Sequence, residues 1–267
     1  MAKEDTAALP ETIYAQVSPR SQGGTSLFDV SDPITFATVS QFLAPIDITA
    51  DAVRGLRRAG FSVLQQSPAL LNIAAPPSLY EQFFQTRLEV REVPVLKPWN
   101  RDGVAQFIDT LDNDIPGFLD TSGSPLSGIL EGGALEKMRY PMQNSTPPNP
   151  NYWHLDVPDD VSRLLNADVA HDGGITGHGM RLVMVDSGWF AHPWFAANTF
   201  TGNVVLGPGS SNAAQDQNGH GTGESANAFS VAPGIDFTMV KMNFANSTGA
   251  FNATATLSPT PDVISCS

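Results

Sequence analysis

An aspartate and a histidine in the second half of the chain have the residue types and the local setting that acid–base chemistry needs. Asp186 directly follows the apolar residues 183–185 and precedes a serine and a glycine, so its carboxylate is expected at the end of a buried element. His220 lies between two glycines where a helix could begin. A carboxylate that accepts the Nδ1–H of a histidine fixes the imidazole tautomer and stabilises the imidazolium, so the histidine can deprotonate a serine. The pair therefore predicts the acid and base of a nucleophilic hydrolase.

The elements around these two residues alternate between strand and helix. The apolar run at residues 181–185 predicts a strand whose two faces are both covered. A helix, a strand, a weaker helix and a strand are predicted after it, at residues 220–229, 237–242, 251–257 and 262–266. This order predicts an α/β domain over residues 151–267, with a parallel sheet and flanking helices. Functional groups of such a sheet collect beyond the carboxyl ends of its strands, which is where Asp186 is expected.

The first part of the chain predicts a separate, small α+β domain. Residues 1–30 are polar and contain prolines and a glycine pair, which predicts a flexible arm. Residues 31–95 predict the order strand, helix, two short strands, helix and strand, at residues 34–43, 50–59, 61–65, 70–74, 76–84 and 88–93. This β-α-β-β-α-β order is typical of a ferredoxin-like domain. Residues 96–150 are rich in turn formers and predict a linker or processing region.

The composition of the chain argues against nucleic-acid and membrane partners and bears on its location and its one thiol. The 267 residues include 14 basic and 27 acidic ones, a net charge of −13, and an acidic surface repels the phosphates of nucleic acid. No apolar run approaches the length of a membrane span, so no membrane partner is expected. The N-terminus lacks the apolar segment of a secretory signal, which predicts a cytoplasmic location by default, with an extracellular one as the alternative. The one cysteine, Cys266, excludes an internal disulfide, and its apolar neighbours predict a buried, inert thiol.

Several blocks of sequence in a fixed order resemble the subtilisin-like serine peptidases. They are residues 176–188 with Asp186, His192-Pro193, residues 218–222 with His220, residues 231–233 with Lys241, and residues 261–267. The resemblance covers about residues 155–267, and an aspartate before a histidine is the order of the subtilisin triad.

The resemblance implies roles for three residues. His220 is the general base, Asp186 orients it, and Ser267 supplies backbone to an extended peptide or protein substrate. The family's chemistry needs no cofactor. The small domain over residues 31–95 is similar to the propeptide of the family, an intramolecular partner that assists folding and inhibits the enzyme.

This chain departs from the family pattern in three places. The oxyanion asparagine and the Gly-Thr-Ser nucleophile motif of the family are not found before Ser267, so the natural domain is expected to continue and this chain alone is expected to be inactive. The segment between His220 and Val231 is shorter than the one that holds a calcium loop in the family, which puts that calcium site in doubt. The residues after Thr222 are Gly223-Glu224 and not a second histidine, so the helix face near the site differs.

Other interpretations of these residues stay open. Gly24-Thr25-Ser26 resembles the missing nucleophile motif, but it lies in the polar arm without a helix after it, which favours a linker. Asp186 taken alone could be a loop carboxylate that caps a turn. No metal site is predicted, because the spacing of His171, His178 and His192 matches no metal-binding pattern. The alternative functions are a split or degenerate peptidase that binds a peptide or a peptidase without turnover, and a nucleotide-binding α/β domain, although no lysine of a phosphate loop follows His220.

Overall fold

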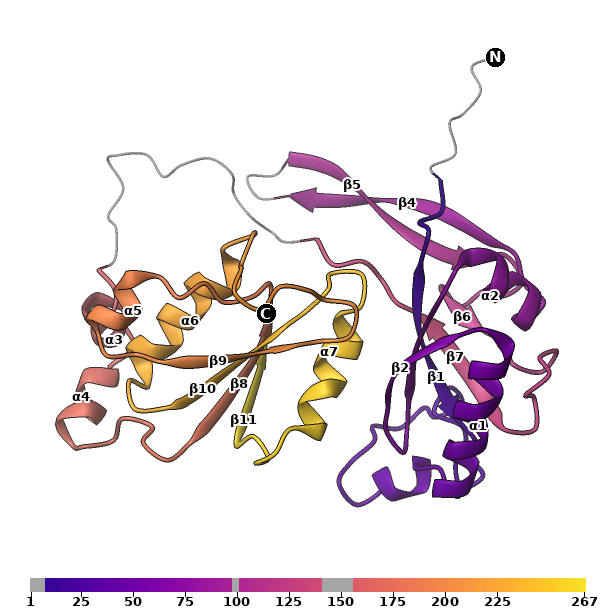
Figure 1. The fold of residues 1–267 in the computed structure, drawn as a ribbon, viewed down its shortest axis with the longest axis horizontal. Coiled ribbons are helices and arrows are strands. Elements are labelled where there is room, and N and C mark those ends of the chain that lie inside the picture. The colour runs from indigo at the N-terminus through magenta and orange to yellow at the C-terminus, as the bar shows by residue number, and fades with distance from the viewer. Residues whose placement is uncertain (1–7, 98–100, 141–155) are drawn as a thin grey trace, which may run out of the picture. The chain divides into compact units, whose positions relative to one another are not determined.

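A computed structural model describes residues 8–97, 101–140 and 156–267 of the chain (Figure 1). The chain divides into two compact units, Met1–Met142 and Gln143–Ser267. The predicted boundary at residues 150 and 151 lies outside the described residues. No helix among the described residues is long and apolar enough to cross a membrane.

Unit 1 is built on a five-stranded antiparallel sheet. Its strands follow the order β2-β3-β1-β7-β6. They are β1 (Ile13–Pro19), β2 (Ser62–Gln66), β3 (Leu71–Ala75), β6 (Phe118–Leu119) and β7 (Leu130–Leu135). β1 is central because it pairs with β3 on one side and with β7 on the other. A separate two-stranded antiparallel sheet joins β4 (Leu88–Lys97) to β5 (Arg101–Thr110).

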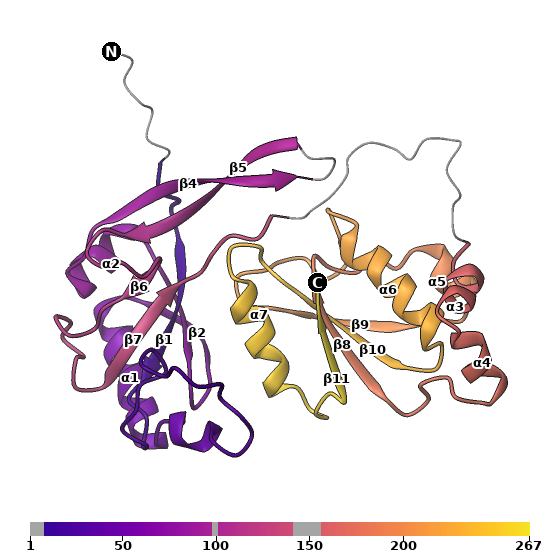
Figure 2. The same ribbon diagram turned by 180° about the vertical axis from the view of Figure 1, so that it is seen from behind.

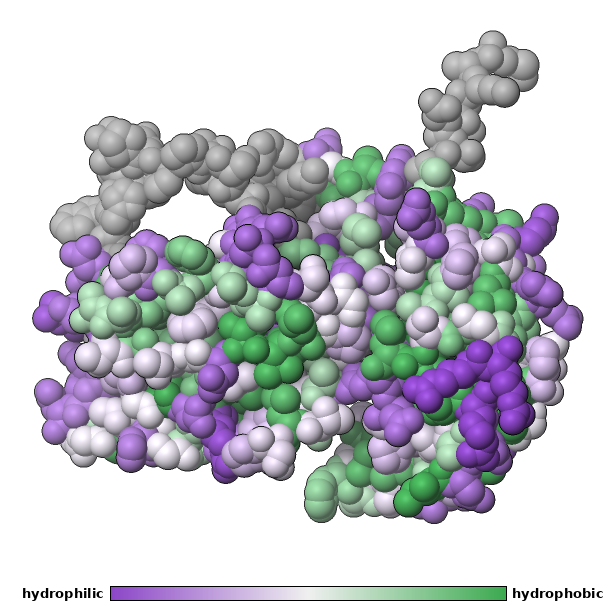
Figure 3. Space-filling model, in the orientation of Figure 1, coloured by the Kyte–Doolittle hydropathy of each residue, from purple (hydrophilic) through white to green (hydrophobic). Residues whose placement is uncertain are grey.

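Two helices cover one face of this sheet (Figure 2). α1 (Ile46–Ala59) buries Ala52, Val53 and Leu56 and ends at Gly60, whose φ of 105° favours glycine. Its arginines face solvent, and Figure 3 shows the resulting hydrophilic band over α1. α2 (Pro77–Phe84) buries Tyr80, Phe83 and Phe84 in the same core. The short 3-10 helix η1 (Val39–Phe42) precedes α1.

For unit 1, the structure differs from the prediction in where some strands lie and in which strands pair. The predicted arm, residues 1–30, contains β1, because its alternate residues Ile13, Ala15 and Val17 are buried in the core. The strand predicted at residues 34–43 is absent there, where the chain forms turns and η1. The strand predicted at 88–93 is confirmed as part of β4, but it pairs with β5 in the separate sheet, and β7 lies beside β1 in the main sheet. The predicted linker, residues 96–150, therefore contains β5, β6 and β7, and the ferredoxin-like assignment stays a prediction.

Unit 2 contains the predicted parallel sheet. Its strands follow the order β11-β8-β10-β9, and each neighbouring pair is parallel. They are β8 (Arg181–Asp186), β9 (Gly202–Leu206), β10 (Asp236–Lys241) and β11 (Val263–Cys266). The strands predicted at residues 181–185, 237–242 and 262–266 are confirmed. The sequence interpretation missed β9, whose few apolar residues stand in a polar, glycine-containing stretch.

Helices cover both faces of this parallel sheet. On one face α5 (Pro193–Ala197) and α6 (His220–Val231) contribute Phe195 and Phe229, which pack with Met184 and Phe237 of the sheet. On the other face α7 (Ser247–Ala253) packs Ala250 against strand residues, and the 3-10 helix η3 (Thr254–Thr256) follows it. The helices α3 (Asp159–Leu164) and α4 (Ala167–Asp172) precede β8. Neighbouring strand residues thus point to opposite cores, as a sheet between two helical layers requires.

The environment of Cys266 corrects a prediction. Its side chain is exposed and not buried. Among the strands that the structure describes, β11 lies at an edge of the sheet and pairs only with β8, and most of its residues are exposed. The apolar residues around Cys266 therefore predicted the strand correctly, but the predicted burial of the strand is wrong.

Candidate active site

β8 brings Asp186 to the carboxyl end of the parallel sheet. Met184 faces the core under α6, and the two-residue repeat of a strand turns Asp186 toward the same side. The side chain is only 1% exposed, and the backbone N–H of Ser187 donates a 2.6 Å hydrogen bond to Oδ1. Burial of a carboxylate without partners would be costly, so this position requires hydrogen-bond donors around it.

Glycines let the start of α6 approach the end of β8. His220 is the first residue of α6, and Gly219 before it has a φ of 82°, a conformation that favours glycine. A Cβ on Gly221 would collide with the carbonyl oxygen of Gly188 and lie 3.1 Å from Cβ of Asp186. The absence of a side chain at Gly221 therefore permits the close contact that places His220 beside Asp186.

The structure brings the two predicted residues into direct contact. His220 Nδ1 lies 2.9 Å from Oδ1 and 3.0 Å from Oδ2 of Asp186. A proton on Nδ1 is then shared with the carboxylate, and Nε2 is left to act as a base. Partial burial alone would lower the pKa of His220, but the hydrogen bond and charge of Asp186, with smaller contributions from the charges of Glu224 and Asp216, raise it above its ordinary value.

The sequence interpretation assigned no role in the site to two acidic residues that lie near this pair. Glu224 Oε1 lies 3.9 Å from Nε2 of His220, one helical turn further along α6. The i,i+4 spacing on the predicted helix could have indicated this contact. Asp216 lies before the helix and accepts hydrogen bonds from Ser187, Gly219 and Thr222. Burial alone would raise the pKa of Asp216, yet these hydrogen bonds outweigh it and lower the pKa.

The other predicted residues do not join this contact. Ser267 is exposed and follows β11, with its backbone N–H 3.5 Å from the carbonyl oxygen of Val185. Its predicted role in binding a substrate backbone is not tested by this contact. Ser26 accepts a hydrogen bond from the N–H of Phe28 within its own loop in unit 1.

Two of the three histidines considered for metal binding, His171 and His192, have hydrogen-bond partners in unit 2. A ring nitrogen of His171 lies 2.8 Å from the carbonyl oxygen of Val231, and His192 caps α5 by accepting from the N–H of Trp194. In the part of the chain that the structure describes, no group of three or more His, Cys, Asp or Glu side chains could hold a metal ion.

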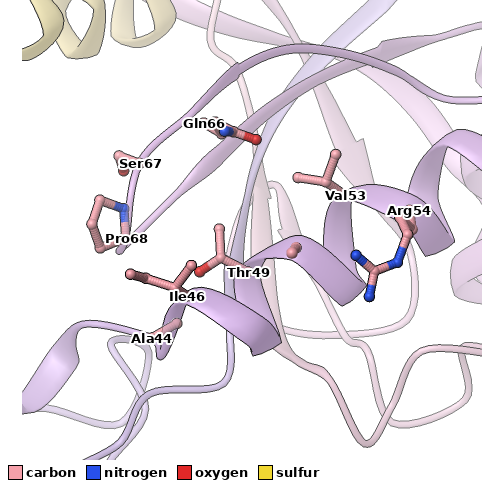
Figure 4. A pocket seen from close by; sticks show the side chains of 9 residues that line it. Ala44, Ile46, Thr49, Val53, Arg54, Gln66, Ser67 and Pro68 are labelled. Carbon is pink, nitrogen blue, oxygen red and sulfur yellow. The ribbon is translucent and has the colours of Figure 1, made fainter.

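Unit 1 has a hollow of a different kind. A pocket of about 390 Å³ lies between α1 and the turn after β2 (Figure 4). Ile46, Thr49 and Val53 line it on one side, and Gln66, Ser67 and Pro68 on the other. Its lining is mostly apolar and contains no paired acid and base, so the contact of Asp186 with His220 is the stronger candidate for catalysis.

Part of the chain is similar to known subtilisins. Subtilisin BL and Subtilisin Savinase of Lederbergia lenta are each 32% identical to it over 108 residues, which cover 37% of this chain and 38% of each relative. M-protease of Shouchella clausii (strain KSM-K16) is also 32% identical over 108 residues, 27% of its own length. The chain thus spans less than two fifths of the curated relatives it matches. No protein-family model matches the chain. The similarities indicate a subtilisin-like relationship for the matched part.

Proposed function

We propose that Asp186 and His220 are the acid and base of a subtilisin-like serine peptidase site. The observation that carries this proposal is the pair of short distances, 2.9 and 3.0 Å, between His220 Nδ1 and the carboxylate of Asp186. Similarity to subtilisins and the position of the pair at the carboxyl end of a parallel sheet support it. Among the described residues no serine hydroxyl is hydrogen-bonded to Nε2, so a serine outside them completes the proposed site.

The proposed chemistry follows from the state of the imidazole. With Nδ1–H directed at Asp186, Nε2 accepts the proton of the serine hydroxyl as the oxygen attacks a peptide carbonyl. The buried carboxylate stabilises the imidazolium that forms. The imidazolium then donates the proton to the leaving amine, and water hydrolyses the acyl-enzyme by the same route. A peptide or protein is therefore the proposed substrate, and no cofactor takes part.

The whole encoded protein provides the test of this function. We expect it to hydrolyse an unfolded protein such as casein and to react with a fluorophosphonate at one serine. Asp186→Asn should lower kcat by about 10⁴-fold, since the wrong tautomer is then favoured. Asp172→Asn, an exposed change of the same kind in unit 2, should retain activity. A whole protein without hydrolysis and without a fluorophosphonate adduct would refute the peptidase proposal. A labelled serine that lies among the described residues would refute the proposal that the nucleophile lies outside them.

The position of Glu224 supports a second candidate function, a site that binds a peptide without cleaving it. A carboxylate near Nε2 can hold a protonated imidazole in place, which suits a site that binds a peptide without cleaving it. This candidate predicts that the whole protein binds peptides with unchanged affinity after Asp186→Asn and never forms an acyl-enzyme.

A further inference from the structure

We infer that Asp216 is a positioning residue that holds His220 against Asp186 through a closed set of hydrogen bonds; its importance for turnover rests on the proposed peptidase function. Asp216 does not touch the imidazole through any hydrogen bond, so it acts on residues that flank His220 in sequence. The Asp216 carboxylate lies in the loop between β9 and α6.

The Asp216 carboxylate accepts four hydrogen bonds. Its Oδ1 accepts from the Ser187 hydroxyl at 2.8 Å and from the Gly219 N–H at 3.0 Å. Its Oδ2 accepts from the Thr222 N–H at 2.9 Å and from the Thr222 hydroxyl at 2.7 Å. An ionised carboxylate has acceptor sites for all four donors. The donors come from the end of β8 and from the start of α6, the two elements that meet at the site.

The hydroxyl groups of Ser187 and Thr222 extend this hydrogen-bond network, because each also accepts from a backbone N–H across the contact between α6 and the segment after β8. The Ser187 hydroxyl donates to Asp216 and accepts from the Gly221 N–H at 2.9 Å. The Thr222 hydroxyl donates to Asp216 and accepts from the Phe190 N–H at 3.0 Å. The backbone on both sides of His220 is therefore fixed to the segment that follows Asp186. Without any one of these hydrogen-bonding groups, the backbone beside His220 would be less restrained and its imidazole could rotate away from Asp186.

Asp216 also takes the place of an ordinary helix cap. The N-cap residue of α6 is Gly219, which has no side chain to accept from the first free N–H groups of the helix. Asp216 supplies that acceptor from three residues earlier, and its negative charge is favourable beside a helix N-terminus. A pure capping role would affect only the stability of α6, whereas the inferred role also predicts a change in the imidazole itself.

The experiment measures the imidazole of His220 by NMR of the ¹⁵N-histidine-labelled 267-residue protein, with the signals assigned from His220→Gln. Thr222→Val removes the hydroxyl without changing charge, and Thr222→Ser keeps it. We expect Thr222→Val to raise the ratio of the minor to the major tautomer of neutral His220 by about five- to tenfold, because the hydrogen bonds of the hydroxyl to Asp216 and from Phe190 are both lost. Thr222→Ser should retain the wild-type ratio.

Asp216→Asn should raise the minor tautomer in the same way and also lower the pKa of His220, because the nearby negative charge is lost. Asp172→Asn is the charge-matched control and should change neither quantity. Equal tautomer ratios in Thr222→Val and Thr222→Ser would overturn the inference, provided that circular dichroism shows both variants to be folded. This comparison tests the inference even if Asp216→Asn does not fold. The NMR result needs no nucleophile, so a change in tautomer together with an inactive whole protein would sustain the positioning role and refute the peptidase function.

Discussion

The imidazole of His220 has a carboxylate near each of its nitrogens. Nδ1 lies 2.9 Å from Asp186, and Nε2 lies 3.9 Å from Oε1 of Glu224. The side chain of Glu224 is 41% exposed, against 1% for Asp186, so solvent screens its charge far more. Glu224 therefore adds less to the raised pKa of His220 than Asp186 does, but its charge lies near Nε2, the nitrogen that must be unprotonated in the proposed mechanism.

Replacing Glu224 tests this arrangement. We expect Glu224→Gln to lower the pKa of His220, since a negative charge near Nε2 is removed, and Asp186→Asn to lower it more. Titration of the His220 ring nitrogens by NMR measures both shifts. An unchanged or raised pKa in Glu224→Gln would contradict the expected effect, with Asp172→Asn as the control for the loss of one charge elsewhere in unit 2. If the whole protein is a peptidase, its activity in Glu224→Gln should begin at a lower pH than in the wild type.

The raised pKa of His220 also predicts how stability depends on pH. The folded protein binds this proton more tightly than the unfolded chain, whose histidine has the ordinary pKa of about 6.5. The contribution of His220 to the free energy of unfolding is thus fully present below that pH and is lost as pH rises through the raised folded value. Urea unfolding of the wild type and of His220→Gln across this range measures it. A difference between the two proteins that grows with rising pH would have the wrong sign.

Much of unit 2 could be predicted from the sequence because its signals are local. Residues 182–185 form a short apolar run that favours a covered strand, and the glycines on both sides of His220 favour a helix start close to another backbone. The rule that functional groups lie at the carboxyl ends of parallel strands predicted the position of Asp186, and the pairing with His220 was predicted from the residue types and the resemblance to subtilisin-like peptidases. Asp216 was missed because its role depends on Ser187, 29 residues earlier in the chain. No periodicity links two such residues.

Unit 1 was predicted less well because its sheet depends on distant pairing. β1 has prolines and polar residues around it, which resemble an arm when taken alone. It is a central strand only because β3 and β7, from residues 71–75 and 130–135, pair with its two edges. The hairpin of β4 and β5 likewise contains turn-forming residues that indicated a linker. Local propensity gave way here to long-range strand pairing.

Two glycines of α6 allow a matched test of the close approach between helix and strand. Gly221→Ala would place a methyl group against the Gly188 backbone, and we expect a loss of about 1–3 kcal/mol in the free energy of unfolding, as for other overpacked sites. Gly223→Ala meets nothing within 4 Å and should stabilise α6 by about 0.5–1 kcal/mol. Urea unfolding measures both. Equal effects of the two substitutions would show that α6 does not need to approach β8 closely.

Lys241 holds the loop that contains Asp216. Its Nζ donates hydrogen bonds of 3.0 and 2.7 Å to the carbonyl oxygens of Asn212 and Gln215. Lys241→Met keeps the length of the side chain but removes both bonds, and because the site is partly exposed we expect a loss of only about 1–2 kcal/mol in the free energy of unfolding.

The local effect of Lys241→Met should be larger than the global one. Without the two bonds the loop is less restrained, so the N–H groups of Gly219 and Thr222, which donate to Asp216, should exchange with deuterium faster than in the wild type. The N–H of Met239, in the middle of β10, should exchange at a rate that reflects only the global change. Equal acceleration at all three amides would mean that Lys241 stabilises unit 2 as a whole and does not restrain the Asp216 loop in particular.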